Sequence, residues 1–578
     1  MDNQVVSEHL KSLLNGREVK AAAFTTYTFE PEFFELEVIP LLLPGNIPFS
    51  SDARVKQFQV REALRESCIN LEVFYDLPIF RKEGRSSPSM EYRFHGVHRG
   101  NSAFHAKLAL VLVHDTEFGD CLLVGVGSNN LTQAGWWDNI ECLHWEIVIP
   151  AKSSRQFINR IKDDVAWLLG ERLLDLTGST SALNKIQEFL NLCKSSNSAI
   201  PVAYYGLNEA ASGNGFLSFL RQQTRNSWSY SNWTLEIISP FFAEDPKNRN
   251  HEFFFGLGVQ EIYMLLPKDQ DDNGLCQREY FQHINREQNI HWAEWADITK
   301  ESLGLKKDSF RRLHAKVYHF YNKKQSWVFI GSINFSHKAM KENIEAGYFL
   351  KLDKAGPLLQ PISKTVADLN FKELEEAPPG SLQEVGDDNI PRIYLSFDWR
   401  KKRLTGITGT SEEYHICILS PEGASAIADW SISEEEIEFN GDTTALQTVL
   451  KNGSLVRLSG FNAHSGKPFT SHNVMLMQTG WSHKPLNLPD LAPEQILAIY
   501  ADMSQDQRQL LLMNAKIRKL VLEGAAGDMT TPTDDFVVEQ FFSEYAEIFY
   551  AFRRLKSRLT EAKLDENFQV LDYYLSGV

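Results

Sequence analysis

The tripeptide His-Ala-Lys occurs at 105–107 and is followed by GSNNLTQAGWWDNIE at 127–141; it returns at 314–316 and is followed by GSINFSHKAMKENIE at 331–345. Written over each other without a gap, the two strings share Gly, Ser, two Asn, Ile and Glu. The first shared Asn precedes the Glu by 11 residues in both copies. A repeat of this kind indicates that the chain carries one structural unit twice.

Each tripeptide is joined to its glycine by two apolar runs with a turn between them. The runs are LALVLV and CLLVGVG in the first copy, and VYHFY and SWVFIG in the second. Short apolar runs rich in β-branched and aromatic residues predict a β-hairpin, which returns its two ends to one edge of a sheet. The two copies are then expected to face each other across a pseudo-two-fold axis.

The side chains repeated in this way suit the cleavage of a phosphodiester. One imidazole can attack phosphorus and the other can protonate the leaving oxygen, because the unperturbed pKa of His is about 6.5. Lys and Asn side chains can hold the non-bridging oxygens as charge develops there. The predicted catalytic residues are His105, Lys107, Asn130, His314, Lys316 and Asn334. This set requires no metal and no other cofactor.

Two carboxylates and two hydroxyls are predicted to support the histidines. Glu141 and Glu345 can accept the second ring N–H and thereby fix tautomer and orientation. Ser128 and Ser332 follow the glycines and either contact phosphate or cap the turn. Two further repeated residues, Asn139 and Asn343, are interpreted either as turn residues or as part of the site.

The paired H-x-K, G-S-x-N and N-x-E strings resemble the motifs of the phospholipase D superfamily over about residues 20–370. An Asp often follows the motif Lys by five residues in that family, and here Leu112 and Tyr321 stand in its place. In this respect the chain resembles the nuclease and tyrosyl-DNA phosphodiesterase branches. The resemblance implies a duplicated α/β/α core and a covalent phosphohistidine, with His105 as nucleophile and His314 as general acid.

The rest of the chain divides by its pattern of strands and helices. A second strand-then-helix start at WTLEIISPFF follows a helical stretch and a Ser/Asn-rich linker, and a turn-rich stretch near 375–391 precedes several short alternating runs. The predicted fold is an α/β core of two phospholipase D-like repeats, then a small β-rich sandwich or barrel, then a helical C-terminal region. The predicted boundaries are 1–195, 196–375, 390–485 and 486–578.

The charge distribution bears on the substrate. The formal net charge of −16 excludes a wholly cationic nucleic-acid coat. Stretches 81–107 and 300–316 are nevertheless basic and lead directly into the tripeptides. They are either solvated faces or a groove that guides phosphates, and the candidate substrate-binding residues there are Arg99, Arg311 and Arg312.

Several other site classes are not expected. The six Cys are scattered and form no C-x-x-C pair, so a zinc knuckle is not predicted. His95 and His98 are interpreted as polar loop residues. Trp136, Trp137 and Phe335 could stack on bases, but a role in core packing is favoured for each. Without an apolar run of about 18 residues or a signal peptide, a cytoplasmic protein with no membrane partner is expected.

The sequence therefore predicts a metal-independent nuclease or DNA 3′-end-processing phosphodiesterase, with DNA favoured over RNA. We expect a bacterial-type enzyme acting in a defence or repair system. A phospholipase D-type lipid phosphodiesterase is one alternative. The other is a binding platform whose C-terminal domains recruit a protein partner such as an ATPase or helicase.

Overall fold

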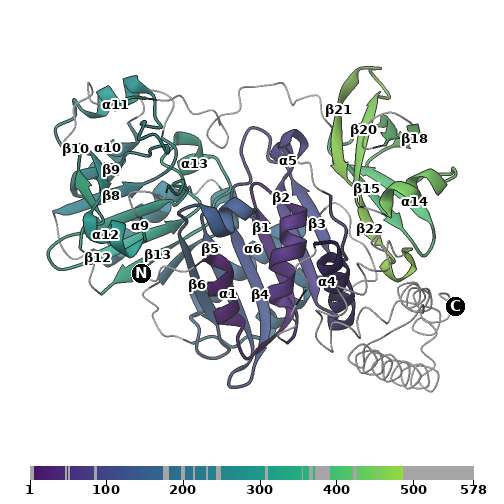
Figure 1. Ribbon diagram of the computed structural model, residues 1–578, viewed down its shortest axis with the longest axis horizontal. Helices are drawn as coiled ribbons and strands as arrows, with labels where there is room; N and C mark the ends of the chain where they lie inside the picture. The colour runs from purple at the N-terminus through teal and green to yellow at the C-terminus, as the bar shows by residue number, and fades with distance from the viewer. Residues whose placement is uncertain are drawn as a thin grey trace, which may run out of the picture.

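The computed structural model describes residues 5–485 apart from internal gaps (Figure 1). The gaps are 46–48, 50–52, 84–86, 173–180, 197–201, 213–214, 229–231, 243–248, 306–309, 354–355, 363–368, 372–390, 421–425 and 452. The helical region predicted for 486–578 lies outside the described residues. The described part mixes helices with several sheets, so the α/β class is confirmed.

The first sheet has six strands in the order β3-β2-β1-β4-β5-β6. The strands are β1 (Arg17–Thr26), β2 (Asn70–Asp76), β3 (Arg93–Val97), β4 (Leu108–Asp115), β5 (Gly119–Gly127) and β6 (Leu143–Val148). Strands β1, β2 and β3 are parallel, and β4, β5 and β6 continue from β1 in antiparallel pairs. The hairpin predicted between the first tripeptide and its glycine is confirmed as β4 and β5.

Helices cover both faces of this sheet, as the alternation along β1 requires. Ala22 and Phe24 pack on the face that holds the N-terminal helices, whereas Ala21 and Ala23 face the later ones. The first group is α1 (Val6–Leu14), α2 (Pro31–Phe33), the π-helix η1 (Phe34–Val38), α3 (Ile39–Leu42) and α4 (Ala53–Ser67). The second group is α6 (Arg155–Gly170) and α7 (Ala182–Leu192), while α5 (Leu77–Glu83) follows β2.

The second sheet has eight strands in the order β14-β10-β9-β8-β11-β12-β13-β7. The strands are β7 (Val202–Tyr205), β8 (Trp233–Ile238), β9 (Val259–Leu265), β10 (Ile290–Trp295), β11 (Val317–Tyr321), β12 (Ser326–Gly331), β13 (Gly347–Leu352) and β14 (Leu359–Pro361). From β10 to β13 the order and directions repeat those from β3 to β6. This repetition is what a duplicated core requires; the duplication itself stays a prediction.

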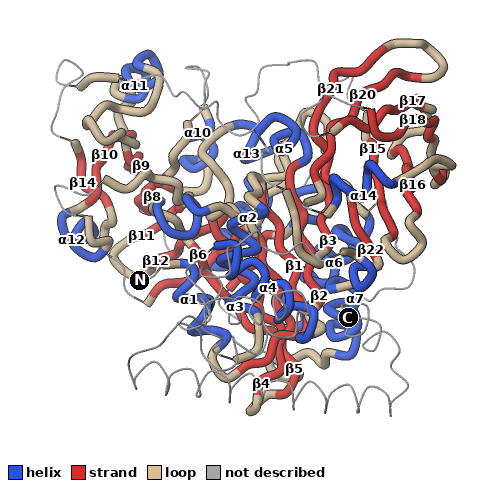
Figure 2. Tube along the Cα trace, turned by 45° about the vertical axis from the view of Figure 1, so that its right-hand side comes forward, coloured by secondary structure: helices blue, strands red, loops and turns tan. Residues whose placement is uncertain are grey.

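The helices of this half are short apart from α9. They are α8 (Leu207–Ala211), α9 (Phe216–Ser227), α10 (Asn250–Phe255), α11 (Arg278–Ile284), α12 (Asp297–Ser302) and α13 (His337–Lys341); the π-helix η2 (Ala134–Asp138) occupies the place of α13 in the first half. One apolar core runs through both sheets, which lie next to each other in both views (Figures 1 and 2).

Residues 391–485 form two four-stranded sheets around a separate apolar core. One sheet contains β15 (Ile393–Asp398), β16 (Arg403–Thr408), β19 (Ile437–Glu438) and β22 (Met477–Thr479). The other contains β17 (Tyr414–Leu419), β18 (Ala426–Ile432), β20 (Leu455–Asn462) and β21 (Pro468–Met475). The sequence predicted strands without helices here, but the unit also contains α14 (Thr444–Leu450) and the 3₁₀-helix η5 (Trp481–His483).

This β-rich unit is docked beside β3. The Tyr394 hydroxyl donates to the Gly96 carbonyl oxygen at 3.0 Å, and Arg392 Nη2 donates to the His98 carbonyl oxygen at 2.7 Å. Both contacts lie at the end of β3, on the chain that leads to the first tripeptide. Among the described residues, no helix is long and apolar enough to cross a membrane.

Candidate active site

Each tripeptide histidine is held by the backbone of the other half. The His105 N–H donates to the Ile344 carbonyl oxygen at 2.9 Å, and the His314 N–H donates to the Ile140 carbonyl oxygen at 2.9 Å. Ile344 directly precedes Glu345, and Ile140 directly precedes Glu141; these are the glutamates that end the two paired strings. The main chain therefore places the carboxylate of one half beside the histidine of the other.

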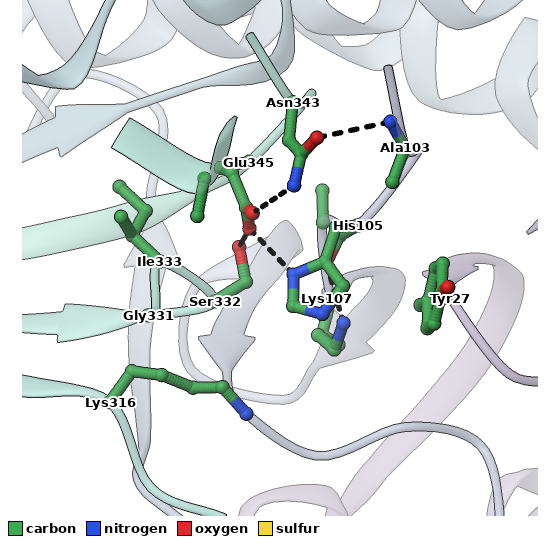
Figure 3. A network of polar contacts seen from close by, with 12 residues as sticks. Tyr27, Ala103, His105, Lys107, Lys316, Gly331, Ser332, Ile333, Asn343 and Glu345 are labelled. Carbon is green, nitrogen blue, oxygen red and sulfur yellow. Dashed lines mark hydrogen bonds and ion pairs between the residues drawn. The ribbon is translucent and has the colours of Figure 1, made fainter. Parts of the chain in front are cut away.

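The two histidines and two glutamates consequently pair across the halves, and Figure 3 shows the pair of His105 with Glu345. His105 Nδ1 lies 2.9 Å from Glu345 Oε2, and His314 Nδ1 lies 2.7 Å from Glu141 Oε1. A carboxylate at Nδ1 favours the tautomer in which Nδ1 carries the proton and Nε2 has a free lone pair. His105 Nε2 is buried and has no hydrogen-bond partner among the described residues.

Glu345 is held by side chains from its own half. Ser332 Oγ donates to Glu345 Oε2, and Asn343 Nδ2 donates to Oε1 at 3.4 Å. The Ser332 hydroxyl in turn accepts the Ala346 N–H at 3.0 Å. Asn343 also accepts the Ala103 N–H at 3.1 Å, so this carboxylate is fixed from several directions (Figure 3).

Glu141 has the same supports in the first half. Ser128 Oγ donates to Glu141 Oε2, Asn139 Nδ2 donates to Oε1 at 3.2 Å, and the Cys142 N–H donates to Ser128 Oγ at 2.9 Å. The serines, for which phosphate contact and turn capping were both open, therefore orient carboxylates. Asn139 also orients Glu141, whereas the sequence left open whether it is a turn residue or part of the site.

Both motif lysines are buried with their ammonium groups in the site. Lys107 Nζ donates to the His105 carbonyl oxygen at 2.6 Å, and Lys316 Nζ donates to the His314 carbonyl oxygen at 2.6 Å. Burial lowers the pKa of Lys316 to about 8, and burial together with the charge of Lys316 holds the pKa of Lys107 well below its usual value. An ammonium has three donors, so each lysine can also bind an anion.

The same environment acts on the imidazoles. Burial lowers the pKa of His314 to about 4, although Glu141 opposes that shift. Burial, followed by the charges of Lys107 and Lys316, lowers the pKa of His105 well below its usual value. Both rings are therefore neutral near pH 7 in the free protein, and an anion bound between the lysines would raise their pKa values.

The two carboxylates differ in their protonation. Burial raises the pKa of Glu345 to about 8 against the opposing charge of Lys107 and the donation from Ser332. Burial acts on Glu141 in the same direction, but its contacts with His314 and Lys316 outweigh it and the pKa falls below the usual value. The two halves of the site therefore have similar contacts, but the pKa values of their glutamates shift in opposite directions.

The two motif asparagines also differ. Asn130 Oδ1 accepts the N–H of Tyr27 at 3.3 Å and that of Thr28 at 3.4 Å, which leaves the amide N–H groups for the site. Asn334 Oδ1 is buried and has no hydrogen-bond partner among the described residues. The residue that corresponds to Tyr27 in the second half is Pro240, which has no N–H.

The correspondence rests on the ends of β1 and β8. Thr26 Oγ1 accepts the N–H that follows Asn130, and Ser239 Oγ accepts the N–H that follows Asn334, at 3.0 and 3.1 Å. Each hydroxyl also donates to the carbonyl oxygen two residues further on, at 2.6 Å. Sequence reasoning missed these residues, and the only signal was the alignment of the strand ends TTYTF and ISPFF.

Tyr27 places an aromatic ring beside one histidine. Its ring centroid lies 5.0 Å from that of His105, and Lys107 Nζ lies 5.4 Å from the Tyr27 centroid. Figure 3 shows Tyr27 and Glu345 on opposite sides of the His105 ring. His314 has no such neighbour at the equivalent position because Pro240 stands there.

The three candidate substrate-binding arginines have different surroundings. Arg99 Nη1 lies 3.0 Å from Glu171 Oε1, and its guanidinium lies over the Trp167 ring. Arg311 donates to the carbonyl oxygens of residues 137–139. Arg312 is exposed, and its charge contributes to the lowered pKa of Lys316. Arg99 and Arg312 are therefore the exposed members of this set, and Arg311 is half-buried.

The remaining sequence candidates lie outside the histidine pair. His95 is buried against Phe74, and His98 Nδ1 lies 3.1 Å from Arg392 Nη2. Trp136 and Phe335 are buried in the apolar cores. Within the described ranges, no group of three or more His, Cys, Asp or Glu side chains is arranged to hold a metal ion.

No protein-family model and no curated protein matches the chain. Among solved structures, yeast tyrosyl-DNA phosphodiesterase is similar at 12% identity and a TM-score of 0.39, over 59% of this chain and 86% of that one. A polyphosphate kinase from Porphyromonas gingivalis is similar at 13% identity and a TM-score of 0.30, over 60% of this chain and 42% of that one. At these TM-scores the likeness assigns no activity.

Proposed function

We propose that the chain is a metal-independent phosphodiesterase that hydrolyses nucleic acid through a covalent phosphohistidine. The observation that carries the proposal is the crossed arrangement of the two His–Glu pairs between two buried lysines. It offers a nucleophile, an acid and two cations around one space, which is the set that phosphoryl transfer needs.

In the first step, the Nε2 lone pair of His105 attacks phosphorus. The N–P bond forms while the bond from phosphorus to the leaving oxygen breaks, and protonated His314 gives its Nε2 proton to that oxygen. Lys107 and Lys316 neutralise the non-bridging oxygens. The positive charge that develops on His105 is stabilised by Glu345 at Nδ1.

In the second step, water cleaves the phosphohistidine. Neutral His314 takes a proton from the water, whose oxygen attacks phosphorus, and the N–P bond breaks to return His105. Because the substrate phosphate is an anion, its binding raises the pKa of His314 and supplies the protonated acid that the first step requires.

Burial supports the assignment of roles. The His105 side chain is 1% exposed and the His314 side chain is 15% exposed. A nucleophile has to stay neutral, which the strongly lowered pKa of His105 ensures. An acid and base has to exchange protons with water, and the more exposed His314 can do so.

The choice of nucleic acid rests on the motif resemblance and on the exposed Arg312 ahead of His314. Phosphate neutralisation by Arg or Lys supplies most of the affinity of proteins for nucleic acid. DNA is proposed before RNA, with cleavage either within a strand or at a 3′ end. The β-rich unit beside β3 is proposed as the site of a protein partner.

The test is cleavage of single- and double-stranded DNA, RNA and a phospholipid by purified protein, each in EDTA, beside His105→Ala and His314→Ala. We expect cleavage of a nucleic acid that survives EDTA and is lost in both variants. Loss of cleavage in EDTA contradicts the metal-independent mechanism. Cleavage of lipid alone indicates a phospholipase, and turnover of none indicates a binding platform.

A further inference from the structure

The candidate site opens to solvent on the side of the second histidine. The side chains of His105, Lys107 and Lys316 are almost fully buried, as is Asn334. In contrast, His314 keeps part of its surface exposed and Asn130 is half-buried. The segment that leads into the partly exposed His314 is therefore the candidate approach for a substrate.

That approach is formed by residues 310–313, which are firmly held. Arg311 Nη2 donates to the carbonyl oxygens of Trp137 at 3.1 Å and Asn139 at 2.9 Å, and Nε donates to that of Asp138 at 3.1 Å. The Ile140 N–H donates to the Arg312 carbonyl oxygen at 2.8 Å. This segment can present its exposed side chains in a fixed position, which lowers the entropy cost of binding.

Phe310 is the notable exposed side chain of this segment. It is 51% exposed, and among the described residues it is one of only four large hydrophobic side chains that are exposed. Arg312 is exposed two residues further on. Burial is the main cause of the lowered pKa of Lys316 in the site, and the charge of Arg312 adds to it. An exposed ring and an exposed cation thus lie at the approach to His314.

We propose that Phe310 is a stacking platform for an unpaired base and that Arg312 binds a neighbouring phosphate, so that the substrate is single-stranded nucleic acid. The proposal rests on the proposed function and names its substrate class. An aromatic ring beside a cation binds single strands with little sequence preference, because every base has a π-face. Three residues separate Phe310 from His314, so their Cα atoms lie at most about 14 Å apart.

A base-paired duplex does not fit this arrangement equally well. Its bases are stacked on one another and present only their edges in the grooves, so the Phe310 ring has no free base face to contact. Arg312 would still meet backbone phosphates. Removal of the Phe310 ring should therefore weaken the binding of single strands more than the binding of duplexes.

The test measures binding and cleavage of one fluorescent DNA oligonucleotide, single-stranded and as a duplex, in EDTA. Phe310→Ala should raise the Kd for the single strand about 5- to 150-fold, the range measured for loss of base stacking, and leave the duplex almost unchanged. Phe310→Leu should behave like Phe310→Ala, whereas Phe310→Tyr should retain affinity. The control is Ile298→Ala on α12, which removes an exposed hydrophobic side chain outside this segment.

The outcomes separate this inference from the proposed function. If the protein cleaves the oligonucleotide but Phe310→Ala binds it as tightly as the wild type, the stacking platform is wrong and the proposed phosphodiesterase activity is still supported. Phe310-dependent binding without cleavage supports the platform and contradicts the enzyme. Full affinity in Phe310→Leu, or equal losses for duplex and single strand, overturns stacking.

Discussion

The His105 and His314 halves of the site share nearly every contact and differ in burial. In both, a serine and an asparagine orient a glutamate, which reaches across to the Nδ1 of the other half's histidine. His105 is closed in beside Tyr27, whereas His314 faces the opening and has Pro240 at the equivalent position. Equal contacts with unequal exposure are what the two proposed roles require, a protected nucleophile and a proton carrier.

Removing the histidines should give the largest effect and separate the two halves. His105→Ala is expected to lower kcat by roughly 10⁶-fold on any substrate, as loss of a nucleophile does. His314→Ala should cost about 10²- to 10⁴-fold on a nucleic acid, because it removes the general acid. Steady-state rates on an oligonucleotide and on a nucleotide 4-nitrophenyl ester measure both.

The ester provides the control, since 4-nitrophenolate leaves without a proton. His314→Ala should then recover most of its first-step rate, seen as a burst of nitrophenolate, whereas His105→Ala should not. The opposite pattern would exchange the roles of the two histidines.

The glutamates should follow the histidines that they touch. Glu345→Gln is expected to lower the burst rate on the ester by about 10²- to 10⁴-fold, because an amide cannot stabilise charge on His105 and its N–H favours the wrong tautomer. Glu141→Gln should slow oligonucleotide cleavage but spare the burst on the ester. Equal losses on the ester would contradict the crossed pairing.

The pH dependence sharpens the electrostatic difference between the halves. The raised pKa of Glu345, about 8, means that its carboxylate is lost as pH falls, and the lowered pKa of Lys316, about 8, means that its ammonium is lost as pH rises. The first step on the 4-nitrophenyl ester needs no protonated His314, so its kcat/KM should be bell-shaped with a maximum near pH 8.

Variants of Glu345 and of the serines can show which group causes the loss of activity at low pH. Glu345→Gln should abolish the acidic limb, and Ser332→Ala should move it to higher pH because the serine hydrogen bond lowers the pKa of Glu345. Ser128→Ala is the matched control in the other half and should leave the limb in place. An acidic limb that persists in Glu345→Gln would belong to another group.

The smallest effect concerns the two strand ends. Pro240→Ala supplies an N–H that the unpartnered Asn334 oxygen can accept, which is worth about 1–3 kcal/mol for a buried acceptor, less about 0.4–1 kcal/mol for the lost proline. The free energy of unfolding in urea should rise by about 1 kcal/mol. The control Pro150→Ala, in the turn after β6, should lose stability, and a similar loss in Pro240→Ala would show that no hydrogen bond forms.

Sequence reasoning found the residues of the candidate site because they recur in register. The repeat located His105, His314 and their companions and predicted both hairpins, since local spacing determines which residues share a sheet edge. It could not predict that each glutamate serves the opposite histidine, because the partners are 173 and 240 residues apart and meet only through tertiary packing.

Other site features depended on partners that a linear pattern does not show. Arg99 looked like a phosphate ligand but pairs with Glu171, 72 residues away, and Arg311 caps carbonyl oxygens of the other half. Tyr27 lacks any motif and becomes visible only beside the His105 ring. Exposure, which separates Phe310 from the buried aromatics, is likewise a property of the folded chain.

The central claim is a covalent bond from phosphorus to His105, and trapping that bond tests it most directly. His314→Asn should be mixed with a nucleotide 4-nitrophenyl ester, so that the first step proceeds and hydrolysis is slow, then quenched in base and mapped by peptide mass spectrometry. The account predicts a nucleotidyl adduct on His105 that is absent from His105→Asn. An adduct on another residue, or a nitrophenolate burst without any adduct, would contradict it.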